Sequence, residues 1–107
     1  MTTAVVLGLA MIGLAVVAAL APPAQAADAQ NGEKLAQRWC VSCHVVGPGQ
    51  RAASADTPPF SAIASRSGFT AAEVALFLLT PHPRMPDMNL SRAEAADLAA
   101  YIAAQRR

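Results

Sequence analysis

Hydrophobic residues form one uninterrupted run near the N-terminus, and beyond it they recur at the spacing of amphipathic helices. Residues 4–21 contain no charged side chain, whereas every charged residue of the chain lies from Asp28 onward. The run is followed by Ala-Gln-Ala at residues 24–26, which has the small-x-small form of a signal-peptide cleavage site. We therefore predict a signal peptide over residues 1–26 and a single domain over residues 27–107.

An uncleaved membrane anchor is the alternative interpretation of residues 1–26. A run of about 18 apolar residues is just long enough to span a bilayer. The first three residues, Met-Thr-Thr, also lack the Lys or Arg that usually precedes the apolar core of a signal peptide. Either arrangement places the rest of the chain in an oxidising space outside the cytoplasm. The cleaved form would be periplasmic, and the uncleaved form would be anchored in the membrane.

Four segments of the domain carry helical signals, and none alternates polar and apolar residues as a strand would. These segments are residues 29–43, residues 60–67, a helix that opens with a capping box from Thr70 to Glu73, and a last helix that opens with another from Ser91 to Glu94. The third segment continues as EVALFLL, so we expect that helix to be largely buried. The inward stripe of the last helix is formed by Ala95, Leu98, Tyr101 and Ile102. The patterns predict an all-α fold.

Composition limits both the partners and the stability of this domain. The chain of 107 residues has 8 Lys+Arg against 7 Asp+Glu, a formal net charge of +1. This balance argues against a nucleic-acid-binding protein, which would normally show a concentrated basic patch. A domain this small often needs a disulfide, a metal or a large cofactor to be stable. A disulfide between Cys40 and Cys43 would close too short a loop to constrain the unfolded chain appreciably.

Both cysteines lie in the segment Arg-Trp-Cys-Val-Ser-Cys-His, residues 38–44. A thioredoxin-like site also contains Trp-Cys-x-x-Cys, but it lies between a strand and a helix and depends on a lowered thiol pKa. A zinc site requires four nitrogen or sulfur ligands. Cys40, Cys43, His44 and His82 could be counted, yet the adjacency of Cys43 and His44 makes tetrahedral ligation awkward.

Cys-x-x-Cys-His is the attachment signature of a c-type haem. The two intervening residues place the sulfurs of Cys40 and Cys43 on one side of a helical turn, where they can form thioethers with the two vinyl groups of a porphyrin. His44 then falls beneath the iron and supplies an imidazole ligand. A haem would also complete the apolar core that so small a domain lacks. We therefore predict one covalently attached haem c.

With this motif in place, essentially the whole of residues 27–107 resembles the short class I cytochromes c. The resemblance rests on CVSCH at 40–44, PPF at 58–60, MPDM at 85–88 and LSRAEAADLAAYI at 90–102. It implies a cytochrome c fold of three to four helices around one haem, in which the N- and C-terminal helices cross with a glycine against an aromatic residue. Gly32 and Tyr101 match these two positions.

The resemblance also implies the remaining ligand of the iron. A methionine after the buried helix supplies the sixth ligand in that family, and Met85 matches it. Met88 matches an apolar filler and is the alternative, while His82 is a rival that would give a bis-histidine iron. The second ring nitrogen of His44 is expected to bond a proline carbonyl, for which Pro58 is the best match and Pro59 the alternative.

His/Met ligation leaves the iron six-coordinate and raises its potential relative to bis-histidine ligation. The resemblance therefore implies a monomeric one-electron carrier, not an enzyme, that meets a redox protein donor and acceptor through small transient interfaces. Two alternatives remain open. One is a membrane-tethered cytochrome c subunit of a larger oxidoreductase. The other is a haem protein whose sixth site is open and binds small ligands.

Overall fold

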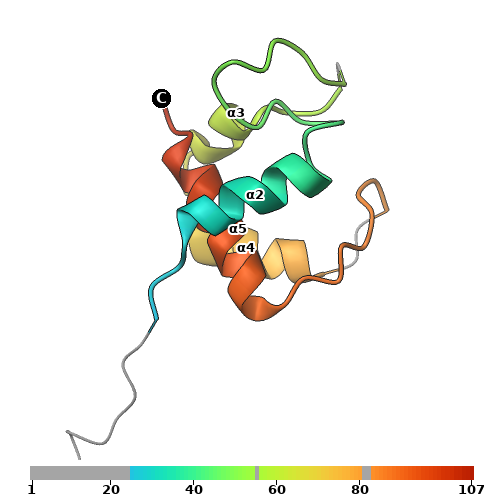
Figure 1. The fold of residues 1–107 in the computed structure, drawn as a ribbon. Coiled ribbons are helices and arrows are strands. Elements are labelled where there is room, and N and C mark those ends of the chain that lie inside the picture. The colour runs from blue at the N-terminus through green and yellow to red at the C-terminus, as the bar shows by residue number, and fades with distance from the viewer. Residues whose placement is uncertain (1–24, 55, 81–82) are drawn as a thin grey trace, which may run out of the picture.

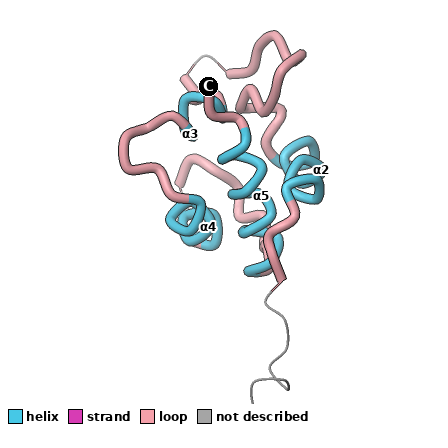
Figure 2. Tube along the Cα trace, turned by 90° about the vertical axis from the view of Figure 1, so that its left-hand side faces the viewer, coloured by secondary structure: helices cyan, strands magenta, loops and turns pink. Residues whose placement is uncertain are grey.

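The computed structural model describes residues 25–54, 56–80 and 83–107. Within these ranges the chain forms four α-helices and no strand, as expected from the sequence (Figures 1 and 2). The helices are α2 (Ala29–Trp39), α3 (Phe60–Ala64), α4 (Ala71–Leu79) and α5 (Arg92–Ala104). No helix in this part of the chain is long and apolar enough to cross a membrane. Residues 1–24, which make up nearly all of the predicted signal peptide or anchor, and the rival ligand His82 lie outside the described residues.

Side-chain caps explain where the three longer helices begin. Ser91 and Glu94 form a complete capping box at α5, with Ser91 Oγ accepting from the Glu94 N–H at 3.1 Å and Glu94 Oε2 accepting from the Ser91 N–H at 2.8 Å. Thr70 caps α4 by accepting from the Glu73 N–H at 3.2 Å. Asp28, which the sequence analysis did not single out, caps α2 through two bonds from its first turn. Both predicted helix starts are thus confirmed.

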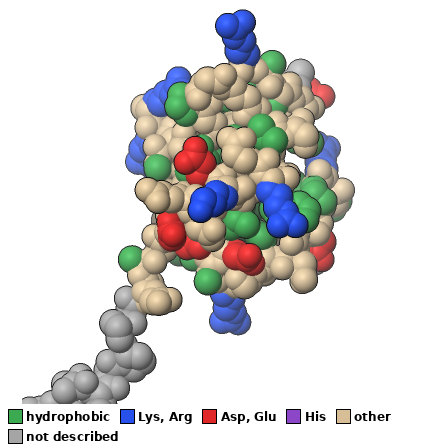
Figure 3. All heavy atoms as spheres, in the orientation of Figure 1, with side chains coloured by type: hydrophobic (Ala, Val, Ile, Leu, Met, Phe, Trp, Pro, Cys, Tyr) green, Lys and Arg blue, Asp and Glu red, His purple; other side chains and the backbone are tan. Residues whose placement is uncertain are grey.

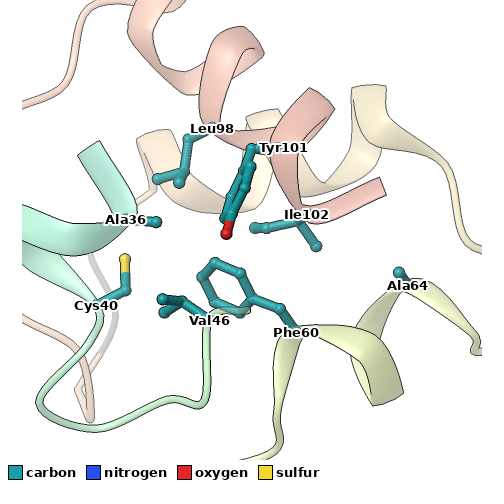
Figure 4. Packing of buried hydrophobic residues seen from close by; sticks show 8 residues of the cluster. All are labelled: Ala36, Cys40, Val46, Phe60, Ala64, Leu98, Tyr101 and Ile102. Atoms are coloured by element: carbon teal, nitrogen blue, oxygen red, sulfur yellow. The ribbon is translucent and has the colours of Figure 1, made fainter. Parts of the chain in front are cut away.

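Helix α5 is the centre of the fold and packs against α2, α3 and α4. Helix α2 crosses α5, so the N- and C-terminal helices of the domain meet as predicted (Figure 1). The predicted inward stripe of α5 is confirmed, because all four of its members are buried. The hydrophobic cluster shown in Figure 4 consists of Ala36, Cys40, Val46, Phe60, Ala64, Leu98, Tyr101 and Ile102.

Gly32 allows the close crossing of α2 over α5. A Cβ atom placed on Gly32 would lie 2.8 Å from the Tyr101 Cβ and would also overlap the backbone carbonyl of Asp97. Real Cβ atoms do not approach other atoms this closely, and neither a backbone carbonyl nor a Cβ can rotate away. The pairing of Gly32 with Tyr101 is therefore the glycine–aromatic contact that the resemblance implied.

The prediction that α4 is largely buried is wrong. No residue of α4 is buried, and Leu76, Phe77 and Leu79 are 67%, 47% and 38% exposed. The physical reason is that α4 packs only on α5 among the described helices, through the face that carries Val74 and Leu78. One side of α4 therefore covers the core, while apolar side chains on the rest of its surface stay partly exposed.

Candidate functional site

The cysteine motif lies in a turn that directly continues α2. Cys40 is the C-cap of the helix and donates its N–H to the Ala36 carbonyl at 2.8 Å. The Cys40 carbonyl in turn accepts from the N–H groups of Cys43, at 3.1 Å, and His44, at 2.8 Å. Cys40, Cys43 and His44 thus lie within one hydrogen-bonded turn of the chain. The two thiols are not joined as a disulfide.

The two thiols have different surroundings. Cys40 is buried within the core cluster, whereas Cys43 is exposed. Burial, and to a smaller degree the neighbouring Cys43, raise the pKa of the Cys40 thiol to about 11. Thiol–disulfide exchange needs a thiolate near neutral pH, which a lowered pKa supplies. The raised pKa of Cys40 therefore counts against a thioredoxin-like function.

The ring of His44 is oriented by the loop that precedes α3. Its Nδ1 atom lies 2.7 Å from the Pro58 carbonyl oxygen. Because a carbonyl can only accept, Nδ1 carries the proton in this contact and the lone pair is on Nε2. The ring of Phe60, the first residue of α3, lies 5.4 Å from the imidazole, centroid to centroid. The structure therefore brings together His44 and Pro58, with Nε2 left as the nitrogen that can bind a metal.

A zinc site finds no support in the described residues. They contain no group of three or more His, Cys, Asp and Glu side chains that could hold a metal ion. The fourth candidate zinc ligand, His82, lies outside the described residues.

The two candidate methionines differ in burial. Met88 is buried, with 8% of its surface exposed, whereas Met85 is half-buried. Met88 lies inside a turn, in which the Asp87 carboxylate accepts from the Asn89 N–H at 2.9 Å and Asn89 has a φ of 49°. In Figure 1 the loop that carries both methionines rises on the same side of the molecule as the C-terminal end of α2.

These residues fit a covalently attached haem. Two thiols and an imidazole with a free Nε2 occupy one turn, and a half-buried thioether is available in a loop on the same side of the molecule. The exposed leucines of α4, Leu76 and Leu79, offer apolar surface to a large apolar group. A haem held by such residues supplies a one-electron Fe(III)/Fe(II) couple.

Charged side chains of both signs lie interspersed on the face of the molecule shown in Figure 3. The formal net charge of +1 agrees with that distribution.

One contact at the site was not predicted from the sequence: the side-chain amide of Gln50 bonds the main chain on both sides of Val45, at His44 and Val46.

Comparison with known proteins places these features in a family. Residues 27–102 match the family described as cytochrome c oxidase, cbb3-type, subunit III. The chain is also 54% identical over 90 residues to cytochrome c-552 of Bradyrhizobium diazoefficiens, a match that covers 84% of this chain and 86% of that protein. No solved structure gives a significant match. The helical fold and the turn that carries Cys40, Cys43 and His44 agree with these matches. The chain therefore belongs to this cytochrome c family: it is a mono-haem c-type cytochrome that carries covalently bound haem c and acts in electron transfer between redox proteins.

Proposed function

We propose that residues 27–107 form a periplasmic, monomeric one-electron carrier that is not an enzyme. In this proposal Cys40 and Cys43 carry the haem thioethers, and His44 and Met85 are the axial ligands of the iron. The observation that carries it is the 2.7 Å contact between His44 Nδ1 and the Pro58 carbonyl. This contact fixes the ring tautomer in which Nε2 is the metal-binding nitrogen.

Met85 is favoured over Met88 by the environment of each side chain. Met88 is buried and serves the protein interior as an apolar filler, as methionine often does. Met85 is half-buried and keeps part of its thioether accessible. A methionine ligand would complete the coordination of the iron and leave no position for a substrate, which supports a carrier over a haem that binds small ligands.

The comparison of Met85→Ala with Met88→Ala tests the axial ligand. We expect Met85→Ala to lose the absorption band of methionine-ligated ferric haem, to lower the reduction potential, and to bind CO rapidly when reduced. Met88→Ala should keep the band and instead lose about 2–5 kcal/mol of stability, as buried methionine-to-alanine changes do. The reverse pattern would assign Met88 as the axial ligand. An unchanged spectrum in both variants would point to His82 as that ligand. Rapid CO binding by the wild-type ferrous protein would favour the open-site alternative.

Export and cleavage are supported by the coincidence of two boundaries. The family match begins at residue 27, directly after the small-x-small site at residues 24–26. The intact mass of the protein purified from cells with a haem-attachment system tests this part of the proposal. A periplasmic product with the mass of residues 27–107 plus one haem is expected. Haem on the uncut chain, recovered in the membrane fraction, would favour the tethered oxidoreductase subunit.

A further inference from the structure

The segment that follows the cysteine motif depends on one side chain for its main-chain hydrogen bonds. Residues 41–52 contain no helix or strand, so their backbone groups cannot pair in a regular ladder. Buried and half-buried backbone groups nevertheless require partners. Gln50 lies half-buried inside this segment and supplies several of them.

The side-chain amide of Gln50 bonds several main-chain groups of the segment. Its Oε1 accepts from the Val46 N–H at 3.0 Å, and its Nε2 donates to the carbonyls of His44 at 2.8 Å and Val41 at 3.0 Å. A third carbonyl, that of Ala52, lies at 3.4 Å from the same nitrogen. The backbone partners determine the orientation of the amide, because an N–H must face the oxygen and carbonyls must face the nitrogen.

These bonds hold His44 through its main chain. The His44 N–H is already bonded to the Cys40 carbonyl at 2.8 Å, and Gln50 takes the His44 carbonyl. Val46 is fully buried, so the same amide also ties the segment to the core. The ring is held at Nδ1 by Pro58. The direction in which Nε2 points therefore depends on contacts of the ring and on hydrogen bonds of the main chain, of which Gln50 makes one.

We propose that Gln50 is a positioning residue that sets the main-chain position of His44 and thereby the geometry of its bond to the haem iron. The inference rests on the proposed role of His44 as an axial ligand. The hydrogen bonds of Gln50 in the described residues go to main-chain groups and not to the ring. Gln50 acts through hydrogen bonds from a single side-chain amide to the carbonyls of Val41 and His44 and to the N–H of Val46.

The test compares Gln50→Met with Gln105→Met in the haem-loaded protein. Methionine preserves length and neutrality and removes the amide. Gln105 is the matched control, because it is also half-buried. Among the described residues its side chain makes a single hydrogen bond, from Nε2 to the Tyr101 carbonyl at 3.3 Å, and that bond lies outside the segment. The measurements are the hyperfine-shifted NMR signals of the His44 ring in the ferric protein, the reduction potential, and unfolding in urea. Gln50→Asn, whose amide is one methylene shorter, is made in parallel.

We expect Gln50→Met to move the His44 signals and the reduction potential, and to raise the unfolding equilibrium constant about tenfold or more because backbone groups lose their partners. Gln105→Met should leave the signals and the potential in place. Wild-type-like signals and potential in Gln50→Met would overturn the proposal, whatever happens to stability, and so would equal shifts in both variants. If Gln50→Met does not accumulate with haem, the same criteria apply to Gln50→Asn. A wild-type protein without hyperfine-shifted His44 ring signals would instead refute the axial role of His44 itself.

Discussion

Replacing Gly32 with alanine tests whether the crossing of α2 over α5 determines the stability of this cytochrome. The added Cβ would meet the Asp97 carbonyl and lie 2.8 Å from the Tyr101 Cβ. Overpacking of this kind costs about 1–3 kcal/mol. We expect the upper end of that range, because both obstructing atoms belong to the rigid part of α5. Helix propensity opposes the effect, since alanine is more favourable than glycine in a helix by about 1 kcal/mol.

The net expectation for Gly32→Ala is a loss of about 2 kcal/mol in the free energy of unfolding, from the difference of these two effects. For a domain of this size that corresponds to a fall in Tm of roughly 8–16 °C. Because Cys40 ends the same helix, the displacement of α2 should also alter the haem absorption spectrum.

Urea unfolding of the haem-loaded protein, followed by far-ultraviolet circular dichroism, measures the stability change. Lys34→Ala is the control, because Lys34 is an exposed residue of the same helix and its replacement should change stability by less than about 0.5 kcal/mol. If Gly32→Ala were as stable as the wild type or more stable, only the helix-propensity gain would be visible. The steric account of the crossing would then be refuted.

Two further predictions concern α5. Asp97 accepts from the Asp28 N–H at 2.7 Å and from the Asn31 side chain at 2.8 Å, so Asp97→Ala should lose about 1–2 kcal/mol of stability; urea unfolding that matches the wild type would contradict this. Burial, and to a smaller degree Glu33, raise the pKa of Tyr101 above its ordinary value of 10.0. The unfolded chain therefore loses the Tyr101 proton at lower pH than the folded protein does. The stabilisation that this group contributes to the folded state is present below pH 10 and is lost as pH rises through the raised pKa. Tyr101 is the single tyrosine of the chain, so difference absorbance measures its titration directly. A titration midpoint at or below pH 10 would oppose the prediction. The Tyr101→Phe variant should not show this loss of stability at alkaline pH.

Features that depend on residues close together in the chain were determined by the sequence alone. The N-caps at Thr70 and Ser91 act within one helical turn, so their positions could be predicted from the local pattern. The turn that gathers Cys40, Cys43 and His44 is likewise a property of five consecutive residues. The family followed from the same motif combined with the downstream Met-Pro and the pattern of the last helix.

Only the tertiary structure decided the features that depend on distant parts of the chain. Composition predicted a buried α4, but exposure depends on how many helices pack on it, and α4 packs on α5 alone among the described helices. Pro58 and Pro59 are neighbours in sequence, and the path of the loop decides which carbonyl reaches His44. Nothing in the pattern distinguished Gln50 from an ordinary loop residue, because its role comes from the backbone groups around it. Local hydrogen bonds and covalent spacing are encoded within one turn of chain, whereas burial and side-chain contacts arise only when separate segments pack together.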